Sequence, residues 1–272
     1  ADSATLAERG ARFDQTLARA DSTRSPDSAL ARWMLPPALK EISGLALTED
    51  GRLFAHNDES GLVSEIDYRR GAVVKRFWVG GRQMRADFEA LTVANGSFFM
   101  MASNGKLYEF REGEDGKQVD YTLHDTHLGR ECEFEGVAFD SASNALLLAC
   151  KNVTTKKLRD FLVIYRWALD DTVSTRLSTL TIPMATVIGS NKWKHLQPTD
   201  ITVDPSSGNY VMVAAPQKAL IEITPAGAVV FARSLPGRHA QAEGVAITRD
   251  GVLIVSDEAL RLPASITLYR WP

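Results

Sequence analysis

The chain has 272 residues, of which 44% are hydrophobic and 24% are charged, as is usual for a globular protein that buries a full core. Its 31 basic and 34 acidic residues give a formal charge of -3, so electrostatics gives no reason to expect nucleic-acid binding. No apolar run approaches the roughly 20 residues of a transmembrane helix. The longest run, Ala145 to Cys150, has the length of a strand.

Residues 1–30 are predicted to form a helix and a linker ahead of the main domain. Leu6, Phe13 and Leu17 lie at helical spacing among charged residues, which predicts an amphipathic helix over Ser3 to Ala20. Such a helix either docks on its own domain or binds a partner in an assembly. The segment from Asp21 to Ser28 is rich in serine and aspartate and is predicted as a linker.

The first residues of the chain also bear on where in the cell the protein is located. The chain starts Ala1-Asp2-Ser3 without an initiator methionine, as an exported protein does after its signal peptide is removed. We therefore expect an extracytoplasmic protein, periplasmic or associated with the envelope. A chain cut at this position for another reason would begin in the same way.

Five short segments in the rest of the chain repeat one motif: Glu41–Leu47, Asp87–Val93, Glu133–Phe139, Gln197–Val203 and Gln241–Ile247. The third residue of each, here called the anchor, is Ser43, Glu89, Glu135, Thr199 or Glu243, with spacings of 46, 46, 64 and 44 residues. Each motif predicts a strand followed by a tight turn, such as Asn95-Gly96, whose glycine supplies a positive φ. Four strands per roughly 45 residues is the size of one blade of a β-propeller.

The fifth unit is too short for four strands. From Glu243 to Pro272 there is room for three, and Ala31 to Pro36, just ahead of the first unit, is predicted to supply the fourth. Closing the ring in this way leaves no unpaired edge between the first and last blades. We therefore predict an all-β fold, a five-bladed β-propeller over residues 31–272. A solenoid is the competing arrangement, but it would need capping repeats instead of a shared blade.

One face of this propeller is expected to carry the function. In antiparallel blades the first-to-second and third-to-fourth turns, which look short, share one face. The second-to-third loops, the links between blades and the starts of the inner strands share the other, here called the loop-rich face. We expect a protein partner or a small ligand there. Basic residues of these loops are candidate contacts, or else plain solvated charges: Lys151, Lys156, Lys157, Arg159 and Lys192.

Acidic side chains are expected to crowd the centre of this face. Because the side-chain period of a strand is 2, the residues two positions before the anchors point to the same side: Glu41, Asp87, Glu133, Gln197 and Gln241. Crowded carboxylates need protons, a paired lysine or arginine, or a hard cation, and Ca²⁺ takes about six to eight oxygen ligands in loose geometry. The candidate calcium ligands are Glu41, Asp87, Glu89, Glu133, Glu135, Asp200 and Glu243. The alternative is that Arg85, Arg130, Lys151 or Lys218 pair with the acids, or that the glutamates cap backbone amides between blades.

The two cysteines fall within the third unit. Cys132 precedes its inner strand and Cys150 ends the neighbouring strand. Antiparallel pairing places them opposite one another or nearly so, which is close enough for a disulfide in an oxidising compartment. Two buried free thiols are the alternative.

The five motifs resemble those of the SdiA-regulated propeller family of bacterial envelope proteins. The resemblance covers Leu39 to Trp271, and its most specific pieces are Glu41–Gly44, Cys132–Gly136 and Gln241–Gly244. It implies a five-bladed propeller, distantly similar to NHL repeats, with a calcium site and no settled biochemical activity. The fourth motif departs from the pattern, because Thr199-Asp200 stands where a Ser-Gly or Glu-Gly pair is expected.

Motifs for common enzyme chemistries are missing from the sequence: there is no nucleophile elbow, zinc-peptidase motif, Cys-x-x-Cys pair or P-loop. His56 lies near the acidic centre and is a candidate base or ligand, whereas the spaced pair His124 and His127 is expected to be solvated. We therefore predict a non-catalytic, calcium-containing binding or assembly module of the cell envelope. It would serve alone or as an accessory subunit of a membrane-associated complex. The alternative is a calcium-dependent phosphoesterase or other hydrolase similar to the propeller phytases, with the basic loop residues receiving phosphate.

Overall fold

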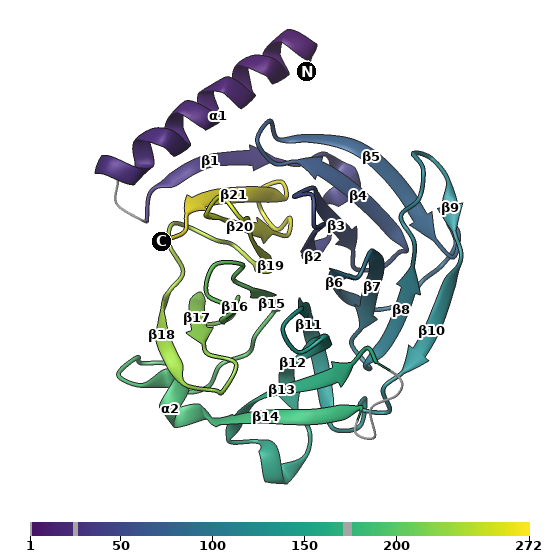
Figure 1. The fold of residues 1–272 in the computed structure, drawn as a ribbon, viewed down its shortest axis with the longest axis vertical. Helices are drawn as coiled ribbons and strands as arrows, with labels where there is room; N and C mark the ends of the chain where they lie inside the picture. The colour runs from purple at the N-terminus through teal and green to yellow at the C-terminus, as the bar shows by residue number, and fades with distance from the viewer. Residues whose placement is uncertain (1, 24–26, 171–175) are drawn as a thin grey trace.

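The chain forms a ring of five antiparallel sheets, as the computed structural model shows for residues 2–23, 27–170 and 176–272 (Figure 1). The innermost strand of each sheet borders the centre of the ring, and the sheets follow one another in chain order (Figure 1). The predicted five-bladed β-propeller is therefore confirmed.

Blades 1 to 4 take their strands in chain order, and blade 5 takes its outer strand from the N-terminal segment. Blade 1 contains β2 (Ile42–Leu47), β3 (Leu53–Asn57), β4 (Leu62–Asp67) and β5 (Ala72–Val79). Blade 2 contains β6 (Phe88–Ala94), β7 (Ser97–Ala102), β8 (Lys106–Phe110) and β10 (Tyr121–Asp125). Blade 3 contains β11 (Cys132–Asp140), β12 (Ala145–Val153), β13 (Phe161–Ala168) and β14 (Leu177–Pro183). Blade 4 contains β15 (Asp200–Val203), β16 (Tyr210–Ala214), β17 (Ala219–Ile223) and β18 (Val229–Ser234), and blade 5 contains β19 (Ala242–Ile247), β20 (Val252–Asp257), β21 (Ser265–Arg270) and β1 (Ala29–Met34).

Glycines directly after the anchors let neighbouring inner strands approach closely. A Cβ atom added to Gly44 on β2 would lie 2.8 Å from the backbone nitrogen of Leu91 on β6. One added to Gly244 on β19 would lie 2.6 Å from the carbonyl oxygen of Ser43. Real Cβ atoms do not come this close to backbone, so the Gly of the repeated motif is required by the narrow centre of the ring.

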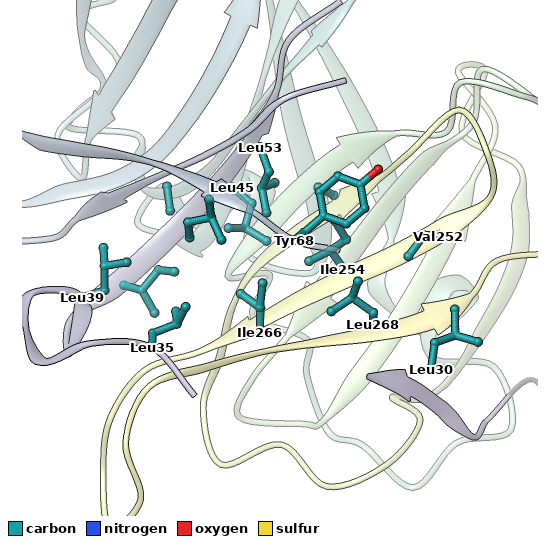
Figure 2. Packing of buried hydrophobic residues seen from close by; sticks show 14 of the residues in the cluster. Leu30, Leu35, Leu39, Leu45, Leu53, Tyr68, Val252, Ile254, Ile266 and Leu268 are labelled. Carbon is teal, nitrogen blue, oxygen red and sulfur yellow. The ribbon is translucent and has the colours of Figure 1, made fainter. Parts of the chain in front are cut away.

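The N-terminal strand closes the ring as predicted. Strand β1 pairs antiparallel with β21, with Trp33 opposite Ile266. The indole Nε1 of Trp33 also donates a hydrogen bond to the carbonyl oxygen of Tyr68 in blade 1, at 2.8 Å. Figure 2 shows apolar side chains from the N-terminal segment, blade 1 and blade 5 in one shared cluster: Leu30, Leu35, Leu45, Leu53, Ile254, Ile266 and Leu268.

Helix α1 (Ser3–Thr23) docks on its own propeller, alongside β1 (Figure 1). Phe13 is buried and meets the ring of Tyr68 edge-on at 6.4 Å between centroids. The helix is three residues longer than predicted, so the start of the predicted linker at Asp21 is wrong; residues 24–26, including Pro26, lie outside the described residues. Within the described ranges, no helix combines the length and the apolar character needed to cross a bilayer.

The expectation that all third-to-fourth turns are short is wrong for blade 2. Its connection spans residues 111–120 and includes β9 (Gln118–Val119), which adds to the outer edge of blade 1 in parallel with β5. Charge holds the connection there, because Arg52 of blade 1 makes two hydrogen bonds to Glu112, at 2.7 and 2.9 Å, and Lys75 pairs with the same carboxylate. The connection joins two neighbouring blades on the face away from the candidate site.

The long connections of blade 3 and of the link to blade 4 carry short helical segments. The loop from β12 to β13 contains the 3₁₀ helix η2 (Lys156–Leu158), and helix α2 (Met184–Ile188) begins the link. A third such turn, η1 (Pro37–Leu39), leads from β1 into blade 1. Met184 and Val187 of α2 are buried in the core between blades 3 and 4, so this end of the link is packed against the domain.

Candidate functional site

Three anchor glutamates from different blades gather around one lysine at the centre of the ring. Glu89 lies on β6, Glu135 on β11 and Glu243 on β19, and each interacts electrostatically with Lys151 on β12. The Nζ atom of Lys151 donates a hydrogen bond to Oε1 of Glu135 at 2.7 Å. Glu135 is only 4% exposed, whereas the side chain of Lys151 is partly exposed. These four residues are called the central cluster.

Burial dominates the electrostatics of the central cluster. It raises the pKa of Glu89, and the charge of Glu135 raises it further. It also raises the pKa of Glu135, against the opposing hydrogen bond from Lys151, and it raises the pKa of Glu243 to about 7. Burial would lower the pKa of Lys151, but the hydrogen bond to Glu135 and the nearby carboxylates outweigh it and raise that pKa. One ammonium group thus serves three carboxyl groups, which leaves room for protons or for further positive charge.

The other two anchors hold the blades together. The hydroxyl of Ser43 donates to the carbonyl oxygen of Glu89 in blade 2 at 2.9 Å. The hydroxyl of Thr199 donates to the carbonyl oxygen of Ala242 in blade 5 at 2.6 Å. Both anchors therefore bond to the backbone of another inner strand.

The residues two positions before the anchors are each engaged by a local partner. The hydrogen bonds are Lys40 to Glu41 at 2.7 Å, Ser103 to Asp87 at 2.6 Å, Asn152 to Glu133 at 2.6 Å, Gln197 to Asn152 at 2.8 Å and Gln241 to Glu258 at 2.5 Å. Asp87 and Glu133 are exposed. The anchors Glu89, Glu135 and Glu243 lie at register shifts of their inner strands, where the predicted alternation of side chains is interrupted. The carboxylates two positions earlier bind neighbours and do not join the central cluster.

Asp200 and His56 are turned toward the backbone. The two carboxyl oxygens of Asp200 accept hydrogen bonds from the backbone N–H groups of Ile201 and Val245, at 2.9 and 2.8 Å. Asp200 is fully buried, and this burial raises its pKa well above the ordinary value. The Nε2 atom of His56 accepts from the backbone N–H of Gly44 at 3.0 Å, and burial lowers the pKa of His56 to about 4. Asp200 occupies the position of the motif glycine and binds the next blade through its side chain.

The basic candidates separate into two groups. Lys151 belongs to the central cluster, whereas four others are exposed on the loops of the loop-rich face: Lys156, Lys157, Arg159 and Lys192. Arg85, Arg130, Lys151 and Lys218 are the alternative partners for the acidic side chains. Among the described residues, Lys151 is the one of these four that forms an ion pair with an anchor glutamate. Arg85 binds nearby carbonyl oxygens instead.

His124 and His127, the pair expected to be solvated, differ from each other. His124 lies on β10, is half-buried and contacts the carboxylate of Glu109 at 2.8 Å, so the prediction is wrong for this residue, whereas His127 is exposed as predicted. In the structure they are not part of the central cluster.

The two cysteines form a disulfide that ties β11 to β12. These strands carry Glu135 and Lys151, and Cys150 directly precedes Lys151 in the chain. The disulfide therefore fixes the two strands whose side chains form the ion pair of the central cluster.

A buried network near blade 5 is not indicated by any motif of the sequence. His239 contacts Asp257 through Nδ1 at 2.6 Å and the hydroxyl of Tyr269 through Nε2 at 2.8 Å. The other oxygen of Asp257 accepts from the backbone N–H of Gln241 at 3.1 Å. These contacts hold the link between blades 4 and 5 against the strands of blade 5. No local motif joins these residues, and Asp257 at the end of a strand is the one signal that could have pointed to it.

The donor chemistry of the central cluster suits a hard cation, but the cluster is not a closed metal cage. Within the part of the chain that the structure describes, no three histidine, cysteine, aspartate or glutamate side chains converge closely enough to hold a metal ion. The carboxylate oxygens are of the kind that Ca²⁺ prefers. A metal ion would therefore require the side chains of the central cluster to draw together and Lys151 to leave Glu135.

The fold and the central cluster define a five-bladed β-propeller with an acidic centre. No protein-family model matches the sequence, and no curated protein is significantly similar to it. Among solved structures, the glutaminyl cyclase of Myxococcus xanthus is similar with a TM-score of 0.60 and 12% identity, over 89% of this chain and 94% of that one. A luciferin-regenerating enzyme matches with a TM-score of 0.54 and 8% identity, over 88% and 95% of the two chains.

A third solved structure, the PQQ-bound aldose sugar dehydrogenase of Streptomyces coelicolor, has a TM-score of 0.52 and 12% identity, over 88% of this chain and 98% of that one. These low identities establish a shared propeller fold and nothing about chemistry. The resemblance to the SdiA-regulated family stays a prediction.

Proposed function

We propose that the protein is a β-propeller binding module of the SdiA-regulated type whose central cluster takes a Ca²⁺ ion. The observation that carries this proposal is the excess of carboxyl groups: Glu89, Glu135 and Glu243 share the single ammonium group of Lys151. When all four groups are ionised their sum is -2, which one divalent cation neutralises. The same cation would replace the protons that burial otherwise retains on these carboxyl groups.

Each residue of the central cluster would have its own role in holding the ion. Glu89, Glu135 and Glu243 would supply carboxylate oxygens, and Lys151 would release Glu135 and turn toward solvent. Bound Ca²⁺ would supply concentrated positive charge with loose oxygen coordination, which can hold a ligand at the loop-rich face. Because a bound ion on the folded chain also stabilises it, calcium would raise resistance to unfolding.

Titration calorimetry with Ca²⁺ on chelator-treated protein tests this proposal. We expect Glu89→Gln, Glu135→Gln and Glu243→Gln each to weaken calcium binding by roughly tenfold or more, since each removes a charged ligand. Glu114→Gln, an exposed acid in the outer connection of blade 2, is the matched control and is expected to leave binding unchanged. Failure of the unaltered protein to bind millimolar calcium, or an equal loss in the control, would refute the proposal.

We also propose that the protein works outside the cytoplasm. The Cys132–Cys150 disulfide supports this, because disulfides persist in oxidising compartments and are rare in the cytosol. Fractionating cells that express the full-length gene tests the location. Recovery of the mature chain in the cytoplasmic fraction, with both thiols alkylated by a membrane-permeant reagent, would contradict it.

A hydrolase is the second candidate, and one observation favours it. Burial raises the pKa of Glu243 to about 7, where a carboxyl group can both give and take a proton, and Lys151 stands beside it. Assays with p-nitrophenyl phosphate and p-nitrophenyl acetate, with calcium or with EGTA, separate the two functions. Turnover that EGTA and Glu243→Gln both abolish would establish the hydrolase; its absence leaves the binding module.

A further inference from the structure

The loop between β20 and β21 forms an exposed apolar groove on the loop-rich face. Leu260 and Leu262 are 60% and 58% exposed, and with Ala240, Ala259 and Arg261 they line a groove of about 540 Å³. Exposed leucines that gather in one loop mark interaction surfaces more often than scattered ones do. These five residues are called the leucine groove.

The loop that carries the leucine groove is held at both ends. The backbone N–H of Ala259 donates to the carbonyl oxygen of Lys40 at 2.8 Å, and that of Glu258 donates to Gln241 at 3.1 Å. At the other end, the carbonyl oxygen of Ala264 accepts from Leu35 at 2.8 Å. The leucines are therefore displayed by an anchored loop, which lowers the entropy that a partner must overcome on binding.

Acidic side chains adjoin the groove. Glu258 directly precedes it and interacts electrostatically with Glu41, which in turn interacts with Asp58. The Oδ1 atom of Asp58 is buried and has no hydrogen-bond partner among the described residues. Glu59 adds a fourth carboxylate, and among the described residues the cations at this place are Lys40, paired with Glu41, and Arg261 of the groove itself. Carboxylates thus outnumber cations by four to two beside the groove, and its border is acidic.

From this combination we infer that the leucine groove and its acidic border bind a segment of a protein partner that carries an apolar side chain next to a lysine or arginine. The apolar side chain would cover Leu260 and Leu262, and the cation would meet Glu258, to which Glu41 and Asp58 add negative charge. An anionic lipid surface fits less well, because the acidic border would repel it. The inference does not rest on the calcium proposal, since the groove lies outside the central cluster.

Fluorescence anisotropy with three labelled peptides tests the inference in EGTA, so that calcium plays no part. The peptides are Gly-Lys-Leu-Lys-Leu-Gly, its acidic counterpart with Glu for Lys, and its polar counterpart with Ser for Leu. We expect binding of the first, with the other two weaker by roughly tenfold or more, the loss that removing one buried leucine or charge contact gives. Equal binding of the acidic peptide, or no binding of the first at millimolar protein, would overturn the inference.

Variants of the protein test whether the first peptide binds at the leucine groove. The double variant Leu260→Ser/Leu262→Ser is expected to weaken the first peptide roughly tenfold or more, and Glu258→Gln to weaken it less and to reduce its salt dependence. Leu123→Ser, on the outer strand of blade 2, is the matched control and should bind normally. If the leucine variant binds as well as the control, or if the leucines instead mediate self-association or sedimentation with phosphatidylglycerol vesicles, the inference is wrong.

Discussion

The ammonium group of Lys151 lies 2.7 Å from a carboxyl oxygen of Glu135, and no second ion pair to an anchor glutamate occurs in the described ranges. The pair joins two neighbouring strands that the Cys132–Cys150 disulfide also connects. Glu89 and Glu243 approach the same lysine from other blades. The charge balance at the centre of the ring therefore depends on one side chain.

Replacing that lysine is expected to destabilise the protein in a pH-dependent way. In Lys151→Met, Glu135 loses its partner while it stays buried, which costs about 1 to 3 kcal/mol at pH 8. The loss should be smaller at pH 5, where the raised pKa values keep the glutamates protonated. Urea unfolding at both pH values measures this. Lys156→Met, at an exposed position, is the control and should change stability by no more than about 0.5 kcal/mol.

The central glutamates also set the pH dependence of the calcium-free protein. Their folded-state pKa values are raised, so the folded chain binds protons more tightly than the unfolded chain. The stability they contribute is present below the ordinary pKa of 4.5 and is lost as the pH rises through about 7. We expect stability to fall by about 1 to 3 kcal/mol between pH 5 and 8, and less in Glu243→Gln. A flat or rising profile in EGTA would contradict this.

Asp200 is expected to matter for stability through its hydrogen bonds. In Asp200→Ala the buried backbone N–H of Val245 loses its acceptor, which costs about 1 to 3 kcal/mol. Asp200→Asn keeps one oxygen acceptor and should lose less. Thermal unfolding of both variants checks the order. Equal stability of the alanine variant and the unaltered protein would show that the bond to blade 5 contributes nothing.

The disulfide should contribute stability by restricting the unfolded chain. Cys132 and Cys150 are separated by 18 residues, and a loop of this length corresponds to about 3 kcal/mol. Cys132→Ala/Cys150→Ala is expected to lose about that amount in urea unfolding. A reducing agent should destabilise the unaltered protein and leave the double variant unchanged; the same effect on both would point to another cause.

The propeller could be predicted because its signal is repeated and local. Five copies of one motif, each with its turn, specify the blades, and the short fifth unit identifies the need for β1. The connection over residues 111–120 was not predicted, because its position depends on Arg52 and Lys75 in another blade. Nothing in the connection's own pattern indicates that contact.

The candidate site was predictable only in part. The repeated motif points to Glu89, Glu135 and Glu243, which lie around Lys151, but it does not indicate the register shift at each of them. It does not reveal that Ser43 and Thr199 bond to the backbone, or that Asp200 supplies hydrogen bonds to blade 5. The repeat shows which positions are equivalent in the five blades, whereas the partner of each side chain depends on local register and on packing between blades. The network of His239 with Asp257 and Tyr269 brings together residues far apart in sequence, and spacing does not encode it.

The most direct measurement of the proposed calcium site is anomalous X-ray diffraction from crystals grown in calcium. We expect a strong anomalous peak among the carboxylates of Glu89, Glu135 and Glu243, with Lys151 moved away from Glu135. If those crystals show no peak there and the 2.7 Å contact of Lys151 with Glu135 persists, the acidic centre is satisfied by its own lysine and is not a calcium site.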